Sequence, residues 1–117
     1  MGIHGVGVDV VDLVRFERSL ERTPGLAARL FRPGEAQLSL ESRAARFAAK
    51  EAFVKALRSS AAMSWQDVEV VVDASGAPSL ALHGAAAARV RELGITAVHL
   101  SLSHDTSVAT AFVVAEC

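Results

Sequence analysis

The feature that most constrains the fold is a long stretch of helix-forming residues in the middle of the chain. Residues Ser42–Arg58 contain no glycine or proline and are rich in Ala, Arg and Lys. These residue types have high intrinsic helix propensity, and alanine allows other elements to pack closely against a helix. The sequence therefore predicts one long helix here, with alanine-rich sides.

Shorter elements are predicted on both sides of this helix from hydrophobic period, β-branched content and turn residues. The expected strands are Ile3–Val11, Trp65–Asp73, Pro78–His83, Thr96–Ser103 and Val108–Ala115. The other expected helices are Leu13–Arg22, one or two short helices within Leu26–Leu40 broken at Pro33–Gly34, and Ala85–Leu93. Because helices dominate the first half and strands the second, we expect an α+β fold with an antiparallel sheet packed against the long central helix.

Composition narrows the class of protein. A chain of 117 residues is the length of one domain, so we expect a single domain over residues 1–117. Its 12 basic and 13 acidic residues nearly cancel, which argues against nucleic-acid or anionic-membrane binding. We see neither a membrane span nor a signal peptide and expect a cytoplasmic protein. A single cysteine, Cys117, excludes an internal disulfide, and 51% hydrophobic residues predict an oligomer.

An aspartate lies inside the apolar first strand. Asp9 follows Gly7-Val8 in a segment that is otherwise hydrophobic. Burying a lone carboxylate costs several kcal/mol, so Asp9 must be paired, bound to a ligand or exposed at the strand end. A plain strand-end or capping role and a functional role both remain open from this segment alone.

The long helix carries a second group of charges. Glu51 and Lys55 are four residues apart and share one face, as in an ordinary surface ion pair. However, the chain has only two lysines, Lys50 and Lys55, and both flank Glu51. A lysine ammonium is a compact point charge suited to phosphate. Asp9 and Glu51 are hard oxygen ligands of the kind that Mg²⁺ uses together with substrate phosphates.

Two further groups remain open between a structural and a functional role. Period-two alternation places His104 on the apolar face of its strand, at the rim of the helix–sheet interface. There it is either a hydrogen-bond donor to a phosphate or a turn histidine bonded to local backbone. On the first helix, Arg15, Arg18 and Arg22 form one stripe. Such a stripe is either solvated surface or a docking site for an acidic helix.

Taken in order, these segments resemble the holo-(acyl-carrier-protein) synthase family of small 4'-phosphopantetheinyl transferases. The matching segments are Val6–Val11, Arg46–Ala52 with Lys55, Trp65 opening a strand, Gly76 with Pro78, and Leu100–Asp105. They span nearly the whole chain with family-like spacing. The resemblance implies transfer of 4'-phosphopantetheine from coenzyme A to a serine of an apo acyl carrier protein, of fatty-acid or polyketide synthesis, releasing adenosine 3',5'-bisphosphate. It also implies a homotrimer with coenzyme A sites between subunits.

The resemblance further implies roles for individual residues. Asp9 and Glu51 match the family's magnesium ligands, and Lys55 matches the lysine that contacts the phosphates. We expect a carboxylate, Glu51 or Asp9 acting through a metal-bound water, to accept the serine proton. The substrate-binding set comprises His104 at the nucleotide site, Lys50, Ser59, Ser60, and Arg15 and Arg22 on the helix that meets the carrier protein.

One segment departs from the family pattern. After Leu57 the family usually has Gly-Thr-Gly, whereas this chain has Arg58-Ser59-Ser60-Ala61-Ala62. The loss of both glycines removes easy positive-φ conformations, so we expect a rebuilt loop in which Arg58, Ser59 and Ser60 contact phosphate. Two other functions stay open: a non-catalytic oligomeric module that binds carrier protein or coenzyme A, and a magnesium-dependent phosphohydrolase.

Overall fold

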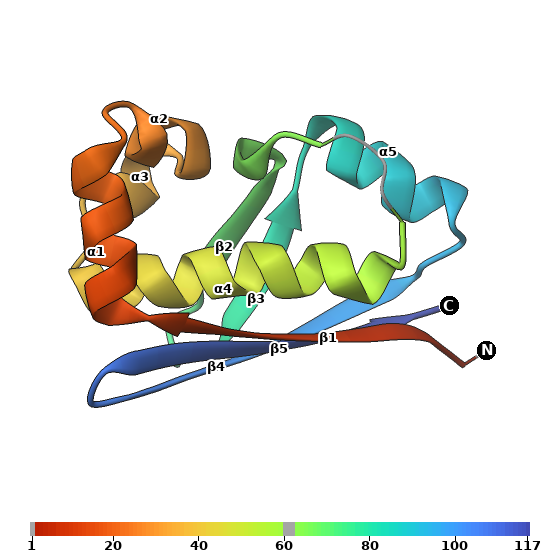
Figure 1. Ribbon diagram of the computed structural model, residues 1–117. Helices are drawn as coiled ribbons and strands as arrows, with labels where there is room; N and C mark the ends of the chain where they lie inside the picture. The colour runs from red at the N-terminus through yellow and green to blue at the C-terminus, as the bar shows by residue number, and fades with distance from the viewer. Residues whose placement is uncertain (1, 60–62) are drawn as a thin grey trace.

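A three-stranded antiparallel sheet and one long helix form the base of the molecule (Figure 1). The computed structural model describes residues 2–59 and 63–117. The sheet has the order β1-β5-β4, so the first strand, β1 (Ile3–Asp12), pairs with the last, β5 (Val108–Glu116), and β4 (Ala97–Asp105) lies at the other edge. The helix α4 (Leu40–Leu57) has 18 residues and packs on one face of this sheet. The α+β class and the antiparallel sheet are confirmed.

Two glycines let α4 approach β1 very closely. Gly5 and Gly7 lie on the face of β1 that meets the helix, and neither leaves room for a side chain. A Cβ atom on Gly7 would lie 1.9 Å from the carbonyl oxygen of Ala52, and one on Gly5 would lie 2.2 Å from that of Ala56. Because side chains alternate along a strand, Asp9 also faces the helix. The glycines therefore place this carboxylate next to α4.

The residues at the two ends of α4 define its span. Ser39 caps the first turn, since its Oγ accepts from the backbone N–H of Ser42 at 3.2 Å. At the other end, Arg58 adopts the left-handed conformation with φ of 54° and closes the helix. The buried side of α4 is built mainly from alanines, as the sequence predicts. The helix begins two residues before the predicted start.

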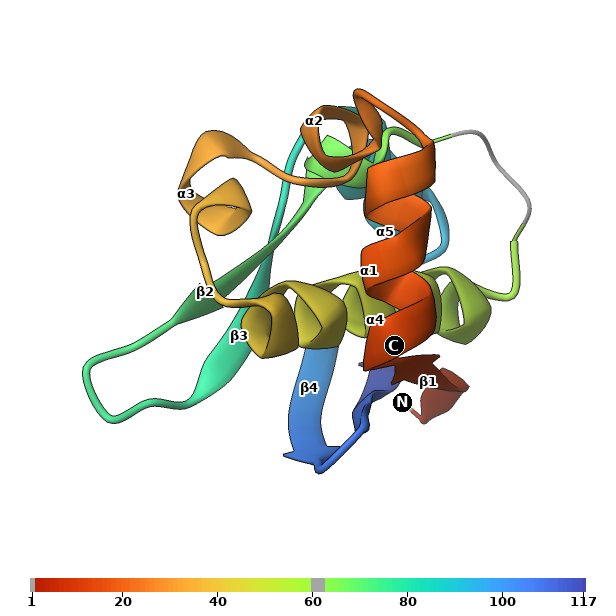
Figure 2. The same cartoon turned by 60° about the vertical axis from the view of Figure 1, so that its left-hand side comes forward.

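The remaining elements cover the far side of α4. Near the start of α4 lie α1 (Leu13–Arg22), α2 (Leu26–Leu30) and α3 (Pro33–Ala36). Then come the 3-10 helix η1 (Trp65–Asp67), the hairpin β2 (Val68–Val72) and β3 (Pro78–Leu82), and α5 (Gly84–Glu92). The hairpin forms a separate two-stranded sheet and extends away from the body (Figure 2).

Three details of the predicted elements were wrong. Trp65 does not open a strand: it begins η1, because the Ser64 hydroxyl accepts from the Gln66 N–H and turns the chain. Pro33 starts α3 rather than breaking a helix, since its fixed φ suits the first helical position. His104 lies within β4, which continues to Asp105, and not in a turn. The predicted bounds of α1 are confirmed.

The outer face of the three-stranded sheet is apolar along β1 and at the middle of β5, and it is uncovered in the single chain. Val6, Val8 and Val10 of β1 are each more than half exposed, and Phe112 of β5 is 47% exposed beside them. Contiguous apolar patches of this kind mark interaction surfaces. Among the described residues, no helix is long and apolar enough to cross a membrane.

Candidate functional site

An open pocket of about 310 Å³ lies where β1, α1 and α4 meet. β1 contributes Asp9 to it, α1 contributes Arg15, and α4 contributes Glu51. The other lining residues are Val10, Val11, Asp12, Phe16, Ser19 and Phe47. The structure thus gathers three of the predicted site residues around one cavity, although Asp9 and Glu51 are 42 positions apart in sequence.

Lys55 joins this group from the next turn of α4. Its Nζ donates to Asp9 Oδ1 at 3.2 Å and to the carbonyl oxygen of Val8 at 2.9 Å. The side chain of Lys55 remains 55% exposed, and that of Asp9 is 21% exposed. The ion pair therefore sits at the surface, where solvent weakens it and where a bound anion can reach the ammonium.

Glu51 is a carboxylate held in an unfavourable environment. Partial burial is the main cause that raises its pKa, and the negative charge of Asp9 raises it further, while Lys55 acts in the opposite direction. The two carboxylates are thus close enough to repel each other. A site with this excess of negative charge favours a cation.

The donor set fits magnesium. Asp9 and Glu51 offer hard carboxylate oxygens from two rigid elements, and Mg²⁺ commonly takes one or two carboxylates while keeping waters and substrate phosphates. Among the described residues, no group of three or more His, Cys, Asp or Glu side chains is placed to hold a metal ion. The pair is therefore an open half-site and not a closed protein cage.

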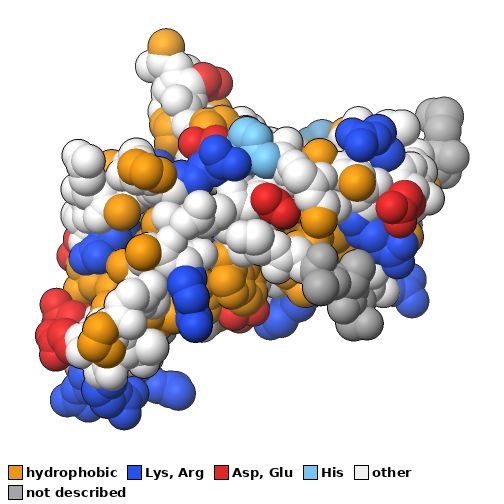
Figure 3. Space-filling model, turned by 90° about the horizontal axis from the view of Figure 1, so that it is seen from above, with side chains coloured by type: hydrophobic (Ala, Val, Ile, Leu, Met, Phe, Trp, Pro, Cys, Tyr) orange, Lys and Arg blue, Asp and Glu red, His pale blue; other side chains and the backbone are white. Residues whose placement is uncertain are grey.

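The two arginines on α1 differ in their relation to the pocket. Arg15 lines it, and its backbone N–H donates to Asp12 Oδ2 at 3.0 Å, which caps the helix. Arg22 lies in the last turn of α1 and does not line the pocket. Both side chains are exposed, as is that of Arg18. Figure 3 shows basic side chains gathered at the corner of the molecule near α1.

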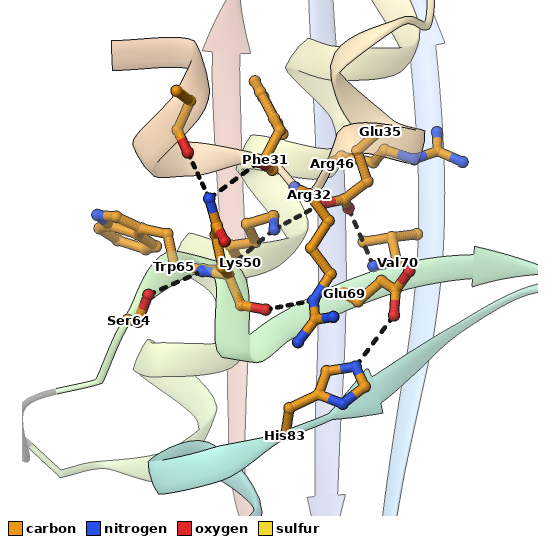
Figure 4. A network of polar contacts seen from close by, with 12 residues as sticks. Phe31, Arg32, Glu35, Arg46, Lys50, Ser64, Trp65, Glu69, Val70 and His83 are labelled. Carbon is orange, nitrogen blue, oxygen red and sulfur yellow. Dashed lines mark hydrogen bonds and ion pairs between the residues drawn. The ribbon is translucent and has the colours of Figure 1, made fainter. Parts of the chain in front are cut away.

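Lys50 has a different environment from the one predicted. Its side chain is completely buried, and its Nζ donates to Glu35 Oε1 at 2.9 Å and to the carbonyl oxygen of Trp65 at 3.0 Å (Figure 4). Burial lowers the pKa of Lys50, and the contact with Glu35 opposes this effect. An ammonium enclosed in this way does not reach a ligand at the surface, so Lys50 is not placed to contact the substrate, contrary to the prediction.

Three predicted residues lie away from the pocket or outside the described residues. The half-buried Ser59 follows α4, and its Oγ accepts from Arg89 Nε of α5 at 3.0 Å. Ser60 falls outside the described residues. His104 is exposed and pairs with Ala109, which in turn pairs with Val11, so β5 separates it from the strand that carries Asp9. The alternation of β4 is confirmed, since Val98, Leu100 and Leu102 are half-buried, whereas His99, Ser101 and Ser103 are exposed.

Sequence reasoning missed the aromatic wall of the pocket. Phe16 of α1 and Phe47 of α4 stack with ring centroids 5.4 Å apart, and both line the cavity. The ring centroid of Trp65 lies 5.8 Å from that of Phe47. The low aromatic content of 5% is the signal that was available, because five phenylalanines and one tryptophan are few enough for their clustering to be informative.

This fold and site belong to a known class of transferase. The family model of the 4'-phosphopantetheinyl transferase superfamily matches residues 5–112, so the chain belongs to that superfamily. A holo-(acyl-carrier-protein) synthase of Clavibacter sepedonicus is 59% identical over 114 residues, covering 97% of this chain and 96% of the relative.

Solved structures with the same name share the fold. The synthase of Neisseria meningitidis superposes with a TM-score of 0.90 at 35% identity, covering 98% of this chain and 99% of that one. The Helicobacter pylori synthase, solved in complex with coenzyme A, gives a TM-score of 0.83 at 28% identity, covering 95% of this chain and 99% of that one. The resemblance read from the sequence is thereby confirmed.

Proposed function

We propose that this chain is a holo-(acyl-carrier-protein) synthase that moves 4'-phosphopantetheine from coenzyme A to a serine of an apo acyl carrier protein. The serine oxygen forms a bond to the β-phosphorus of the diphosphate, and the bond from that phosphorus to the bridging oxygen breaks. Adenosine 3',5'-bisphosphate leaves with the bridging oxygen. The observation that carries this proposal is the convergence of Asp9, Glu51 and Arg15 on one open pocket, with Lys55 paired to Asp9 beside it.

The two carboxylates form the magnesium site in this proposal. Asp9 and Glu51 would hold Mg²⁺, which supplies positive charge to the phosphoryl oxygens when bound. Support comes from their shared pocket and from the raised pKa of Glu51, caused by partial burial and by Asp9. One of these two carboxylates also accepts the proton of the serine hydroxyl.

Lys55 supplies a second positive charge that belongs to the chain itself. Its Nζ donates to one oxygen of Asp9 and to the Val8 carbonyl oxygen, and its side chain is more than half exposed, so it can exchange these surface bonds for a phosphate without unfolding any element. A charge held in place beside a pocket stabilises a transition state more strongly than the same charge does in bulk water, because the pocket walls exclude part of the solvent. Phe16 and Phe47 provide that apolar wall.

The carrier protein docks on α1 in this proposal. Arg15 is exposed at the mouth of the pocket and Arg22 lies further along the same helix. An acidic helix of the carrier protein would meet this stripe and bring its serine to the pocket, with electrostatics setting the encounter rate and register. We also place the protein in the cytoplasm.

A homotrimer completes the site. The exposed apolar face formed by Val6, Val8, Val10 and Phe112 supports association with further copies. His104 and Ser59 do not line the pocket of their own chain, so in a trimer they serve a site between subunits. Size-exclusion chromatography with light scattering should give about three times the chain mass of 12.3 kDa; a monomer would contradict the assembly.

One assay separates the candidate functions. The protein is mixed with coenzyme A, Mg²⁺ and an apo carrier protein, and the carrier is weighed by mass spectrometry. A gain of one phosphopantetheine supports transfer. Complex formation without a gain supports a binding module, and breakdown of coenzyme A without carrier supports a phosphohydrolase.

Matched variants test the two carboxylates. Asp9→Ala and Glu51→Ala should each abolish transfer and leave a folded oligomer. Glu17→Ala, on the exposed face of α1, serves as the control for loss of an acidic side chain. Full activity of either pocket variant at ordinary magnesium concentration would defeat the assignment.

A further inference from the structure

A buried ion pair lies on the side of α4 opposite the sheet, behind the pocket. Glu35 is 3% exposed and Lys50 is fully buried. Glu35 Oε1 accepts from Lys50 Nζ and from the Arg32 N–H at 3.1 Å, and Glu35 Oε2 accepts from the Val70 N–H at 3.1 Å. One ion pair thus ties α3, α4 and β2 together (Figure 4).

Lys50 adds a link from this pair to Trp65. Its Nζ donates to the Trp65 carbonyl oxygen at 3.0 Å, which fixes the backbone of η1 against α4. The Trp65 ring contacts the Phe47 ring, which stacks on Phe16. Two of these three rings line the pocket. A continuous set of contacts therefore runs from the buried charge to the pocket wall.

The arrangement is more than a hydrophobic core requires. Replacing a buried ion pair by apolar residues is often neutral or stabilising, so its presence is weak evidence of a purely stabilising role. The buried ammonium also fixes one position of the backbone: it holds the carbonyl group of Trp65, the residue whose ring contacts Phe47 in the pocket wall. Lys50 also directly precedes Glu51 in α4.

We propose that Lys50 is a positioning residue, which holds Trp65 and, through the Phe47–Phe16 stack, sets the shape of the pocket that binds coenzyme A. This inference rests on the proposed function, which names that ligand. Lys50 does not touch the reacting groups. Its effect passes through Phe47 and Phe16, which line the pocket, so we expect it to act on binding more than on the chemical step.

Trp65 makes the inference measurable, because the chain has one tryptophan and no tyrosine. Fluorescence excited at the long-wavelength edge of indole absorption therefore reports on Trp65 alone. In the wild-type protein, saturating coenzyme A with Mg²⁺ should shift or quench this emission. A wild-type protein that is active by mass spectrometry and shows no change in emission would overturn the inference without touching the proposed function.

The decisive variant is the double substitution Glu35→Gln with Lys50→Met. The introduced glutamine has a single carbonyl oxygen, so it keeps one of the two backbone bonds, from the Arg32 or the Val70 N–H, and the introduced methionine keeps the apolar stem. The charge pair, the bond to Trp65 and one backbone bond are therefore lost. With native circular dichroism retained, Trp65 emission should change in the free protein. KM for coenzyme A should rise roughly 2- to 30-fold, with a smaller change in kcat.

His83→Gln is the matched control, since it changes a partly exposed side chain that is hydrogen-bonded to Glu69 in the same layer. It should leave both emission and KM as in the wild type. The inference fails if the folded double variant keeps a wild-type KM, or if KM rises while Trp65 emission stays unchanged. If the double variant does not fold, the coenzyme A titration of the wild type decides.

Discussion

The two lysines of α4 lie five residues apart and have opposite environments. Lys50 is fully buried and paired with a carboxylate that is also buried, whereas Lys55 is more than half exposed and shares one oxygen of a partly exposed aspartate. The first ion pair holds segments together, and the second remains available to a ligand. The comparison shows that residue type and spacing do not determine the role of a charged side chain. Burial decides whether the side chain can leave its ion-pair partner and bind a ligand.

The same contrast appears in the carboxylates. Glu35 accepts hydrogen bonds on both oxygens, from a side chain and from two backbone N–H groups. Asp9 accepts from one side-chain ammonium through Oδ1, and the environment of Glu51 raises its pKa through burial and the charge of Asp9. A carboxylate whose two oxygens both accept hydrogen bonds stabilises the fold, whereas a pair of carboxylates with fewer donors is suited to bind a cation.

Removing the buried ammonium should have the largest effect. In Lys50→Met, the carboxylate of Glu35 stays buried without its cation, which costs about 3–5 kcal/mol of unfolding free energy. Urea denaturation followed by circular dichroism measures this loss. Restoring much of it by adding Glu35→Gln would confirm that the buried charge is responsible, whereas a stable single variant would contradict the contrast.

Removing the exposed ammonium should affect activity and spare the fold. Lys55→Met should lower kcat/KM by about 100-fold, the size expected for one charged group that stabilises a transition state. The unfolding free energy should change by less than about 1 kcal/mol, as for surface ion pairs. Steady-state kinetics and denaturation on the same preparation test both parts; a large loss of stability would erase the difference between the lysines.

Adding a side chain at Gly7, on the strand that carries Asp9, should lower both stability and activity. In Gly7→Ala, the new methyl group meets the Ala52 carbonyl oxygen, and α4 must move away from β1. Overpacking of this kind costs about 1–3 kcal/mol, and Asp9 moves relative to Glu51, so activity should fall as well. Both are measured by denaturation and by the transfer assay. Gly34→Ala is the control, because no atom lies within 4 Å of the added carbon.

The smallest expected effect is a gain in stability from Glu51→Gln. Because the folded-state pKa of Glu51 is raised by burial and by Asp9, its ionisation opposes folding. The wild type should therefore lose stability relative to the variant as pH rises from about 4.5 through the raised pKa, and the difference should stay constant above it. Thermal melts with a chelator present measure this difference; a variant less stable than the wild type at neutral pH would contradict it.

The periodic parts of the fold could be predicted from sequence. Alanine-rich Ser42–Arg58 and alternating Thr96–Ser103 lie in a helix and a strand as expected, because local pattern dominates there. The start of β2 was misplaced, since Trp65 is used in an aromatic cluster and not in a ladder. Arg58 keeps the left-handed conformation in which glycine is usual, because the helix end itself requires it.

The site could be predicted only in part. Asp9 and Glu51 meet at one pocket, as expected, and Arg15, which was expected only on the helix that meets the carrier protein, lines it too; the roles of all three stay predictions. Lys50 was assigned to the wrong environment, because its partner Glu35 comes from a four-residue helix whose position no local pattern reveals. The Phe16–Phe47 wall depends on tertiary contacts between α1 and α4, which sequence spacing alone does not encode.

Because the two faces of β1 have different neighbours, insertions and deletions within this strand should be poorly tolerated. On the inner side, Gly5 and Gly7 leave no room for a side chain beside the helix carbonyls, whereas exposed valines occupy outer positions 6, 8 and 10. Deleting or inserting a single codon inside the strand would exchange the two sides. Valine side chains would then collide with α4, and the carboxylate would point away from the pocket, so we expect substitutions but not one-residue indels in this segment to survive in functional enzymes.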